Sequence, residues 1–200
     1  TFEDWKQVEP PRFGTILSYT DYIDWKNFIA LKLAEDMAMR AEAVREINPR
    51  PVVTSHAAVP SLFTSPMSGD GTPDDRLMAD QLDYYGTSIY PKHSTPSTHW
   101  SLMTRTVAVD FTRSMNLKNG GFYIGELQGG FGVRGTIVGD PITPEDQRNW
   151  LWSILAKGAR AINIYAYYPM SSGYESGGYG LINLDGTLTD AEASELAEAI

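Results

Sequence analysis

The chain of 200 residues carries 16 Lys and Arg against 25 Asp and Glu, which gives a formal net charge of −9. Its content of 42% hydrophobic and 20% charged residues is ordinary for one globular domain with a sizeable core. The acidic balance argues against a nucleic-acid partner, since phosphate binding favours a basic surface. No apolar run approaches the roughly 20 residues that span a bilayer, so no membrane partner is expected. The absence of cysteine excludes disulfides, thiolate metal sites and a cysteine nucleophile.

The first half of the chain predicts a long helix, a strand and a short helix. Apolar residues recur at three-, four- and seven-residue spacing, which predicts a helix over 24–47 with one apolar face formed by Ile29, Leu33, Met37, Val44 and Ile47. Asn48-Pro49 ends this helix, and the apolar run 51–57 predicts the first strand. Thr72-Pro73 predicts the start of a short helix that runs to about residue 83, with Thr72 as its cap.

Strands and helices continue to alternate in the second half. The predicted elements are a second strand over 86–91, a helix over 98–116, a third strand over 122–128, a helix from the cap Thr143 to about residue 157, a fourth strand over 159–168 and a final helix that starts at Thr189. The strands begin 35, 36 and 37 residues apart with a helix after each, a pattern that predicts βαβ units and a parallel sheet. The long strand-to-helix loops all lie at the carboxyl end of such a sheet, where active sites are built.

The fold class predicted for residues 1–200 is α/β, as the C-terminal half of a (β/α)₈ TIM barrel. Gly-rich nucleotide-binding fingerprints are missing, and eight βα units would take roughly 250 residues. Four strands preceded by a helix therefore predict the last four strands of a barrel with their helices. Because Thr1 is no initiator methionine and the chain ends inside a predicted helix, we expect a fragment whose upstream barrel half is absent. An open four-stranded sheet is the alternative.

Glu126 is the strongest candidate for chemistry. It lies near the carboxyl end of the apolar run Phe122–Gln128, and burying a carboxylate costs several kcal/mol unless it is paired or hydrogen-bonded. A barrel tolerates that cost at a strand end where chemistry needs the charge. The alternative is a structural Glu126 that a neighbouring Arg or Lys satisfies.

Two further residues end predicted strands beside that carboxylate. The hydroxyl of Tyr90 could hydrogen-bond a carboxylate on the neighbouring strand, or Tyr90 could be a partly exposed aromatic residue. His56 could donate to a substrate hydroxyl, or be a hydrogen-bonded core histidine. Three histidines without tight spacing or cysteine make a weak metal site, so neither a metal nor a cofactor is expected.

Tyrosines crowd the last predicted strand and the loop after it, at positions Tyr165, Tyr167, Tyr168, Tyr174 and Tyr179. Aromatic faces can stack on the apolar faces of sugars, although packing between helix and barrel is the alternative for some of these rings. Successive strand residues face opposite ways, so only one of Tyr167 and Tyr168 can point into the barrel mouth. Glu175 in the same loop could bind ring hydroxyls or be solvated.

Together these residues resemble the clan A glycoside hydrolases, and most of all the family 42 β-galactosidase type. The resemblance covers nearly the whole chain. It rests on Trp5 with Glu9-Pro10-Pro11, on the run 109–114 followed by 122–126, and on 156–160 before the aromatic strand. The resemblance implies that a TIM barrel hydrolyses a carbohydrate substrate, with a possible homo-oligomer in the full-length protein.

What the resemblance implies can be stated residue by residue. Glu126 would be the catalytic nucleophile with Tyr90 beside it. The last-strand aromatics, Tyr167 and Tyr168, and Glu175 would line the sugar site. Beyond what the resemblance implies, the predicted substrate-binding set also includes Tyr90, His56 and Gln128. The family commonly has Trp-Arg where Tyr167-Tyr168 stand, and a Glu-x-x-His element that here reads Glu175-Ser-Gly-Gly. The family's cysteine zinc cluster has no counterpart.

The acid/base residue of the clan is the Glu of an Asn-Glu pair, and no Asn-Glu occurs in this sequence. We therefore expect that residue upstream of Thr1. The resulting hypothesis is a retaining β-glycosidase segment for terminal β-galactoside-like linkages, which needs two carboxyls about 5–5.5 Å apart. Two alternatives stay open: a non-catalytic sugar-binding module or pseudoenzyme, and a clan A glycosidase of other specificity, such as a mannosidase or a glucosidase.

Overall fold

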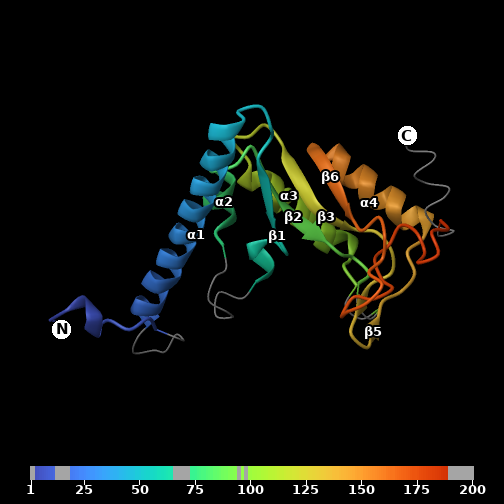
Figure 1. Cartoon of the computed structure of the whole chain (residues 1–200), viewed down its shortest axis with the longest axis horizontal. Coiled ribbons are helices and arrows are strands. Elements are labelled where there is room, and N and C mark those ends of the chain that lie inside the picture. Colours follow the sequence, from blue (N-terminus) through green and yellow to red (C-terminus); the bar gives the residue numbers. More distant parts are fainter. Residues whose placement is uncertain (1–2, 12–18, 65–72, 94–95, 97–98, 189–200) are drawn as a thin grey trace.

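The computed structural model describes residues 3–11, 19–64, 73–93, 96 and 99–188 (Figure 1). Its helices are α1 (Tyr19–Ile47), α2 (Asp75–Ala79), α3 (Leu102–Met115) and α4 (Pro144–Ala156), with short 3₁₀ turns η1 (Trp5–Gln7) and η2 (Ser61–Phe63). Its strands are β1 (Thr54–Ala57), β2 (Tyr84–Ile89), β3 (Phe122–Gln128) and β6 (Ala159–Tyr165), with a small ribbon of β4 (Val133–Arg134) and β5 (Ile137–Val138). No described helix is long and apolar enough to cross a membrane.

The main sheet confirms the predicted parallel α/β organisation. Its order is β1-β2-β3-β6 and all its pairings are parallel. Because the order is sequential, each helix connects one strand to its immediate neighbour in the sheet. The strand order does not reverse, as it does in a doubly wound sheet. The carboxyl ends of all four strands, and the loops that follow them, consequently lie together at one end of the sheet.

Two core clusters join the helices to the sheet. One is centred on Phe122, Ile124 and Leu127 of β3, with Trp150 and Ile154 of α4 packed against them. The other joins α1 and α2 to Tyr85 of β2. Because successive strand residues alternate between faces, the packing of Phe122 and Ile124 against α4 turns Tyr123 toward the opposite face of the sheet.

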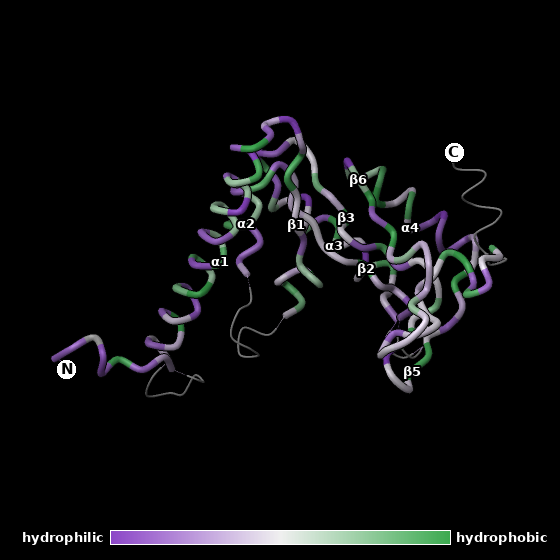
Figure 2. Tube along the Cα trace, viewed as in Figure 1, coloured by the Kyte–Doolittle hydropathy of each residue, from purple (hydrophilic) through white to green (hydrophobic). Residues whose placement is uncertain are grey.

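The first long helix starts earlier than predicted, and its apolar face is only partly covered. α1 begins at Tyr19 rather than at residue 24, and its buried residues are Tyr22, Ala34 and Ala41. Figure 2 shows hydrophobic positions recurring along this helix, and its exposed large ones are Tyr19, Ile23, Phe28, Leu31, Met39, Val44 and Ile47. The described neighbour α2 covers only part of that face.

The start of α2 corrects the predicted cap. Asp74 caps the helix, and its carboxylate accepts hydrogen bonds from the main-chain N–H groups of Arg76 and Leu77, both at 2.9 Å. Asp and Thr are both favourable N-cap residues, so residue type alone does not decide between Thr72 and Asp74. Thr72 itself lies outside the described residues, and the helix ends at Ala79 rather than near residue 83.

For the elements after α2, the structure confirms some predicted boundaries and moves others. The predicted cap of α4 is confirmed: Thr143 forms a capping box with Asp146, in which the two residues exchange hydrogen bonds between side chain and main chain. α3 starts at Leu102 with Ser101 as its cap, later than the predicted residue 98. β6 ends at Tyr165 because the next N–H, that of Ala166, donates to Tyr179 in a loop instead of to a strand. The predicted final helix from Thr189 lies outside the described residues.

The two edge strands lead to a prediction about the 200-residue chain. Among the described strands, β1 pairs only with β2 and β6 only with β3, so each has an edge of unpaired main-chain groups. Open edges recruit other chains. We expect the chain, expressed by itself, to self-associate with rising concentration in light scattering after size-exclusion chromatography. A monodisperse monomer with slowly exchanging amides in both edge strands would instead favour an independent open sheet.

Candidate active site

The carboxylate of Glu126 lies at the carboxyl end of β3, with about 33% of its side chain exposed. Two hydroxyls from the neighbouring strand region donate to the same oxygen, Oε2: that of Tyr90 at 2.7 Å and that of Ser88 at 3.2 Å. The described residues place no Lys or Arg within salt-bridge distance of this carboxylate. The predicted hydrogen bond between Tyr90 and a carboxylate on the next strand is thus confirmed, and the alternative of a basic partner finds no support in the described residues.

The imidazole of His56 lies on the other side of the carboxylate. Its Nε2 is 3.6 Å from Glu126 Oε1, which is too long for a hydrogen bond. The ring of His56 lies over Gly125, where a Cβ would overlap it. The edge of Tyr123 supports the imidazole, with ring centroids 6.0 Å apart. The sequence Gly125-Glu126 therefore leaves room for the histidine beside the carboxylate.

Three tyrosine rings form a cluster next to Glu126, which we call the tyrosine cluster: Tyr90, Tyr165 and Tyr179. The ring centroids are 6.3 Å apart for Tyr90 and Tyr165, 5.4 Å for Tyr90 and Tyr179, and 5.6 Å for Tyr165 and Tyr179. The hydroxyl of Tyr165 donates to Glu175 Oε2 at 2.8 Å. The cluster therefore connects Glu126 on β3 with Glu175 in the last loop.

Burial sets the protonation of these phenols. Burial raises the pKa of Tyr90 above its ordinary value, and the hydrogen bond to Glu126 is the second largest cause of this rise. Burial, followed in size by the hydrogen bond to Glu175, raises the pKa of Tyr165 to about 12. Both hydroxyls consequently remain protonated donors at neutral pH, and each can stabilise the ionised form of its carboxylate.

Tyr167 and Tyr168 lie differently from the prediction. The alternation argument required both to be strand residues, but β6 ends at Tyr165, so neither side chain direction is fixed by the sheet. Tyr167 is 70% exposed and Tyr168 is 50% exposed, with its hydroxyl donating to the carbonyl of Leu184 at 2.6 Å. Tyr165 is the last-strand residue that joins the tyrosine cluster, because it is the last residue held in the strand.

Gln128 was predicted to bind substrate, and the structure corrects that placement. The side chain is fully buried, its Oε1 accepts from the main-chain N–H of Lys92 at 2.8 Å, and its Nε2 donates to the carbonyl of Gly130 at 3.1 Å. A buried amide must satisfy its own polar groups, and here the main chain of two loops does so. Gln128 thus holds the loops around the site and does not face the open surface.

The described residues contain no group of three or more His, Asp or Glu that could hold a metal ion. The Nδ1–H of His93 donates to the carbonyl of Tyr90 at 2.7 Å, and burial lowers the pKa of this imidazole below its ordinary value. His93 is therefore a mostly neutral side chain at pH 7 that packs edge-on against the ring of Tyr90, with centroids 5.6 Å apart.

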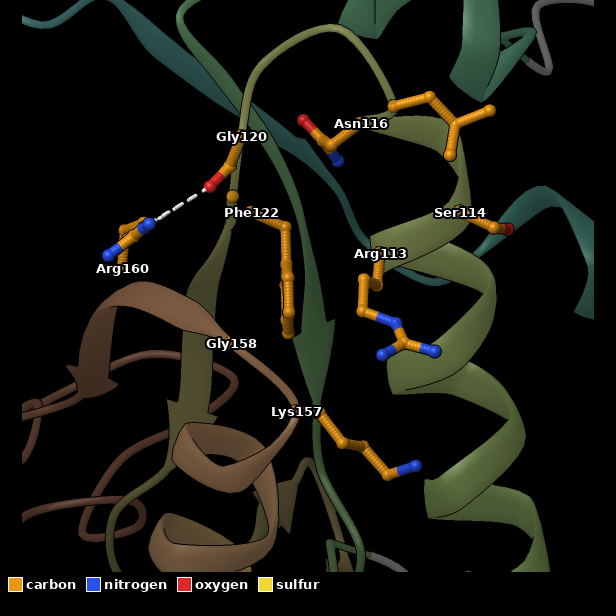
Figure 3. Close-up of a pocket in the computed structure, with 10 residues that line it drawn as sticks. Arg113, Ser114, Asn116, Gly120, Phe122, Lys157, Gly158 and Arg160 are labelled. Atoms are coloured by element: carbon orange, nitrogen blue, oxygen red, sulfur yellow. Dashed lines mark hydrogen bonds between the residues drawn. The ribbon is translucent and has the colours of Figure 1, made fainter.

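A pocket of about 520 Å³ opens at the other end of the sheet (Figure 3). It lies between the amino end of β3 and the C-terminal ends of α3 and α4, and no Asp or Glu lines it. The ammonium of Lys157 bonds both carboxylate oxygens of Asp110 at 2.7 Å, and Arg160 donates to the carbonyl of Gly120. Lys157 therefore joins the end of α4 to α3, Arg160 holds the turn before β3, and the pocket lies at the opposite end of β3 from Glu126.

A parallel α/β sheet with a hydrogen-bonded carboxylate at a strand's carboxyl end is the arrangement on which barrel hydrolases build their sites. Comparison with known families agrees with this class. The family model for glycoside hydrolase family 42, described as β-galactosidase, matches residues 1–200. The chain therefore belongs to glycoside hydrolase family 42. No curated protein sequence matches the chain.

Solved structures share the fold. The β-galactosidase from Rahnella sp. R3 aligns with a TM-score of 0.77 and 16% identity, over 99% of this chain and 28% of that one. The β-galactosidase from Bacillus circulans sp. alkalophilus aligns with a TM-score of 0.76 and 19% identity over the same shares. A family 17 β-1,3-glucanosyltransferase from Rhizomucor miehei aligns more loosely, with a TM-score of 0.51 and 14% identity, over 79% of this chain and 56% of that one. The chain spans less than a third of the length of the matching β-galactosidases.

Proposed function

We propose that the chain is the nucleophile-bearing part of a retaining β-glycosidase that hydrolyses terminal β-galactoside-like linkages. Glu126 is the nucleophile. The observation that carries this assignment is its carboxylate at the end of β3, held by the hydroxyls of Tyr90 and Ser88 and partly open to solvent. Hydrogen bonds to one oxygen, Oε2, orient the group and leave the other oxygen, Oε1, available for attack.

The proposed reaction proceeds in two displacements. Glu126 Oε1 donates an electron pair to the anomeric carbon while the bond to the leaving oxygen breaks, and a second carboxylic acid protonates that oxygen. Water, deprotonated by the same second carboxylate, then attacks the anomeric carbon and releases Glu126. We assign the second role to the Glu of an Asn-Glu pair upstream of Thr1, at about 5–5.5 Å from Glu126.

The proposed domain is the last half of a (β/α)₈ barrel, formed by residues 1–200. Three features support it: the sequential strand order, the packing of the helices against one face, and the single partner of each edge strand. In a closed barrel, an upstream strand would precede α1 and pair with β1. That strand would bring the acid/base residue next to His56 and Glu126.

The proposed sugar site combines the neighbours of the nucleophile. His56 and Glu175 would bind ring hydroxyls, and the rings of Tyr90 and Tyr165 would border the sugar. The exposed rings of Tyr167 and Tyr168 lie outside the tyrosine cluster and would meet the ligand further from the scissile bond. Gln128 would act by holding the loops.

An activated 2-deoxy-2-fluoro-β-galactoside tests this proposal in the full-length enzyme. The fluorine slows the second displacement, so the nucleophile should accumulate as a covalent adduct. We expect a peptide that contains Glu126 to carry the sugar in mass spectrometry after digestion. A label on another carboxylate, or hydrolysis without any covalent adduct, would contradict the assignment of Glu126.

Replacing Tyr90 by Phe should slow formation of the adduct by about 10- to 100-fold, since a hydrogen bond to a charged group contributes about 1.5–3 kcal/mol.

The matched control is Tyr84→Phe, which removes a hydroxyl at the amino end of β2, the strand that Tyr90 follows. It should leave the rate unchanged. Equal rates for Tyr90→Phe and the wild type would remove Tyr90 from the mechanism.

A second candidate is a clan A glycosidase for another sugar, such as a mannoside or a glucoside. It is favoured by the exposed pair Tyr167-Tyr168, where the family commonly has Trp-Arg, and by Glu175 bonded to Tyr165. A panel of nitrophenyl glycosides on the full-length protein decides between the sugars. Binding of sugars without hydrolysis of any of them would indicate the non-catalytic module instead.

A further inference from the structure

Tyr179 adopts a backbone conformation that tyrosine rarely adopts. Among the described residues it is the one non-glycine residue with a positive φ, at 63°. Its neighbours in sequence are Gly177, Gly178 and Gly180, and Gly177 also has a positive φ, at 80°. Glycine is the default residue for this conformation, and strained residues concentrate at functional sites. The presence of tyrosine in a glycine-rich turn indicates that its side chain is required.

The main chain at this position would be held equally well with glycine. The N–H of Tyr179 donates to the carbonyl of Phe131 at 2.8 Å, and its carbonyl accepts from Gly130 at 2.9 Å and from Ala166 at 2.7 Å. These bonds join the loop after β3 to the loop after β6. None of them involves the side chain, so they do not explain why a tyrosine stands there.

The ring of Tyr179 packs against the ring of Tyr90. The side chain is only 3% exposed, and the two rings meet edge to face, with centroids 5.4 Å apart and an interplanar angle of 83°. His93 and Tyr165 border the ring of Tyr90 as well. The phenol of Tyr90 is thus enclosed by three rings. Its hydroxyl makes a shorter hydrogen bond to Glu126 than the hydroxyl of Ser88 does.

We propose that Tyr179 is a positioning residue that holds the ring of Tyr90 so that its hydroxyl stays on Glu126 Oε2. The inference rests on the proposed function of Glu126 as nucleophile. Burial leaves the Tyr179 ring little surface for a substrate, so it acts through Tyr90. Without this ring, Tyr90 gains room to turn, its hydrogen bond is made for less of the time, and attack by Glu126 slows.

The test measures the rate of adduct formation with an activated 2-deoxy-2-fluoro-β-galactoside in the full-length enzyme. Tyr179→Phe keeps the ring and should react within about twofold of the wild type. Tyr179→Gly suits the positive φ, keeps the main-chain hydrogen bonds, and should react about tenfold more slowly. The double variant Tyr90→Phe/Tyr179→Gly should be no slower than Tyr90→Phe, because both changes remove the same hydrogen bond.

Met170→Ala is the control, since Met170 lies in the same loop with 48% of its surface exposed, and it should react like the wild type. A Tyr179→Gly enzyme as fast as the wild type, or a double variant in which the two losses multiply, would overturn the inference. Should Tyr179→Gly not fold, Tyr179→Leu gives the same comparison, and failure of both to fold would overturn it by making the role structural. A wild-type adduct on a residue other than Glu126 refutes the proposed function and is seen before any variant is compared.

Discussion

Replacing Glu126 by Gln should lower kcat of the full-length enzyme on a nitrophenyl β-galactoside by at least about a thousandfold. Glutamine keeps the size of the side chain and can still accept from Tyr90, but its amide is a very poor nucleophile, so no glycosyl-enzyme forms. The fold should persist, because Glu126 contributes hydrogen bonds at an open site and is not part of either core cluster. Steady-state kinetics together with the thermal unfolding temperature provide the measurement.

Two further variants sharpen this result. Glu145→Gln removes a carboxylate in the first turn of α4, away from the site, and should leave kcat unchanged. Glu126→Ala opens space at the anomeric carbon, so added azide should attack it directly and restore the release of nitrophenol, with an inverted glycosyl azide as product. Near-wild-type kcat in Glu126→Gln, or no response of Glu126→Ala to azide, would count against Glu126 as nucleophile.

The 200 residues expressed without any further segment should not hydrolyse glycosides above the uncatalysed background. A retaining mechanism requires a second carboxyl that faces the nucleophile. In the described part of the chain, the carboxylate connected to Glu126 through the tyrosine cluster is Glu175, and the hydroxyl of Tyr165 already binds it. A fluorogenic β-galactoside assay of the purified chain, compared with the full-length protein, provides the measurement.

Residual hydrolysis by the isolated chain would have one of two distinguishable sources. Hydrolysis by the chain that disappears in Glu126→Ala would show that both catalytic groups lie within these residues. Glu175→Gln would then identify the second group, because its loss would abolish the activity as well. Hydrolysis that survives Glu126→Ala would point to a contaminating enzyme.

The sequence predicted the position of Glu126 beside Tyr90 for a physical reason. Carboxyl ends of neighbouring parallel strands meet at one edge, so two polar residues that end adjacent strands must lie close together. The alternation of side chains along a strand, by contrast, did not apply to Tyr167 and Tyr168, because they follow the end of β6. Once a strand ends, the direction of a side chain depends on hydrogen bonds between loops, such as that from Ala166 to Tyr179, which periodicity does not encode.

Polarity alone also could not assign Gln128. A polar residue at a strand end suggests a ligand contact, but this side chain satisfies the main chain of Lys92 and Gly130 instead. Such a choice depends on which loop groups would otherwise be buried without partners. Tyr179 is among the tyrosines that the sequence analysis names, and what distinguishes it from the others is its place in Gly177-Gly178-Tyr179-Gly180, where glycine would be expected.

The close packing of His56 against Gly125 couples two positions that lie far apart in the sequence. The imidazole of His56 occupies the volume that any side chain at position 125 would need. A larger residue at position 125 thus requires an earlier substitution of His56 by a smaller residue. Once position 125 carries a side chain, a return to histidine at position 56 is blocked. Positions 56 and 125 should consequently change in a fixed order during divergence, and the residue beside Glu126 is less free to change than its exposure suggests.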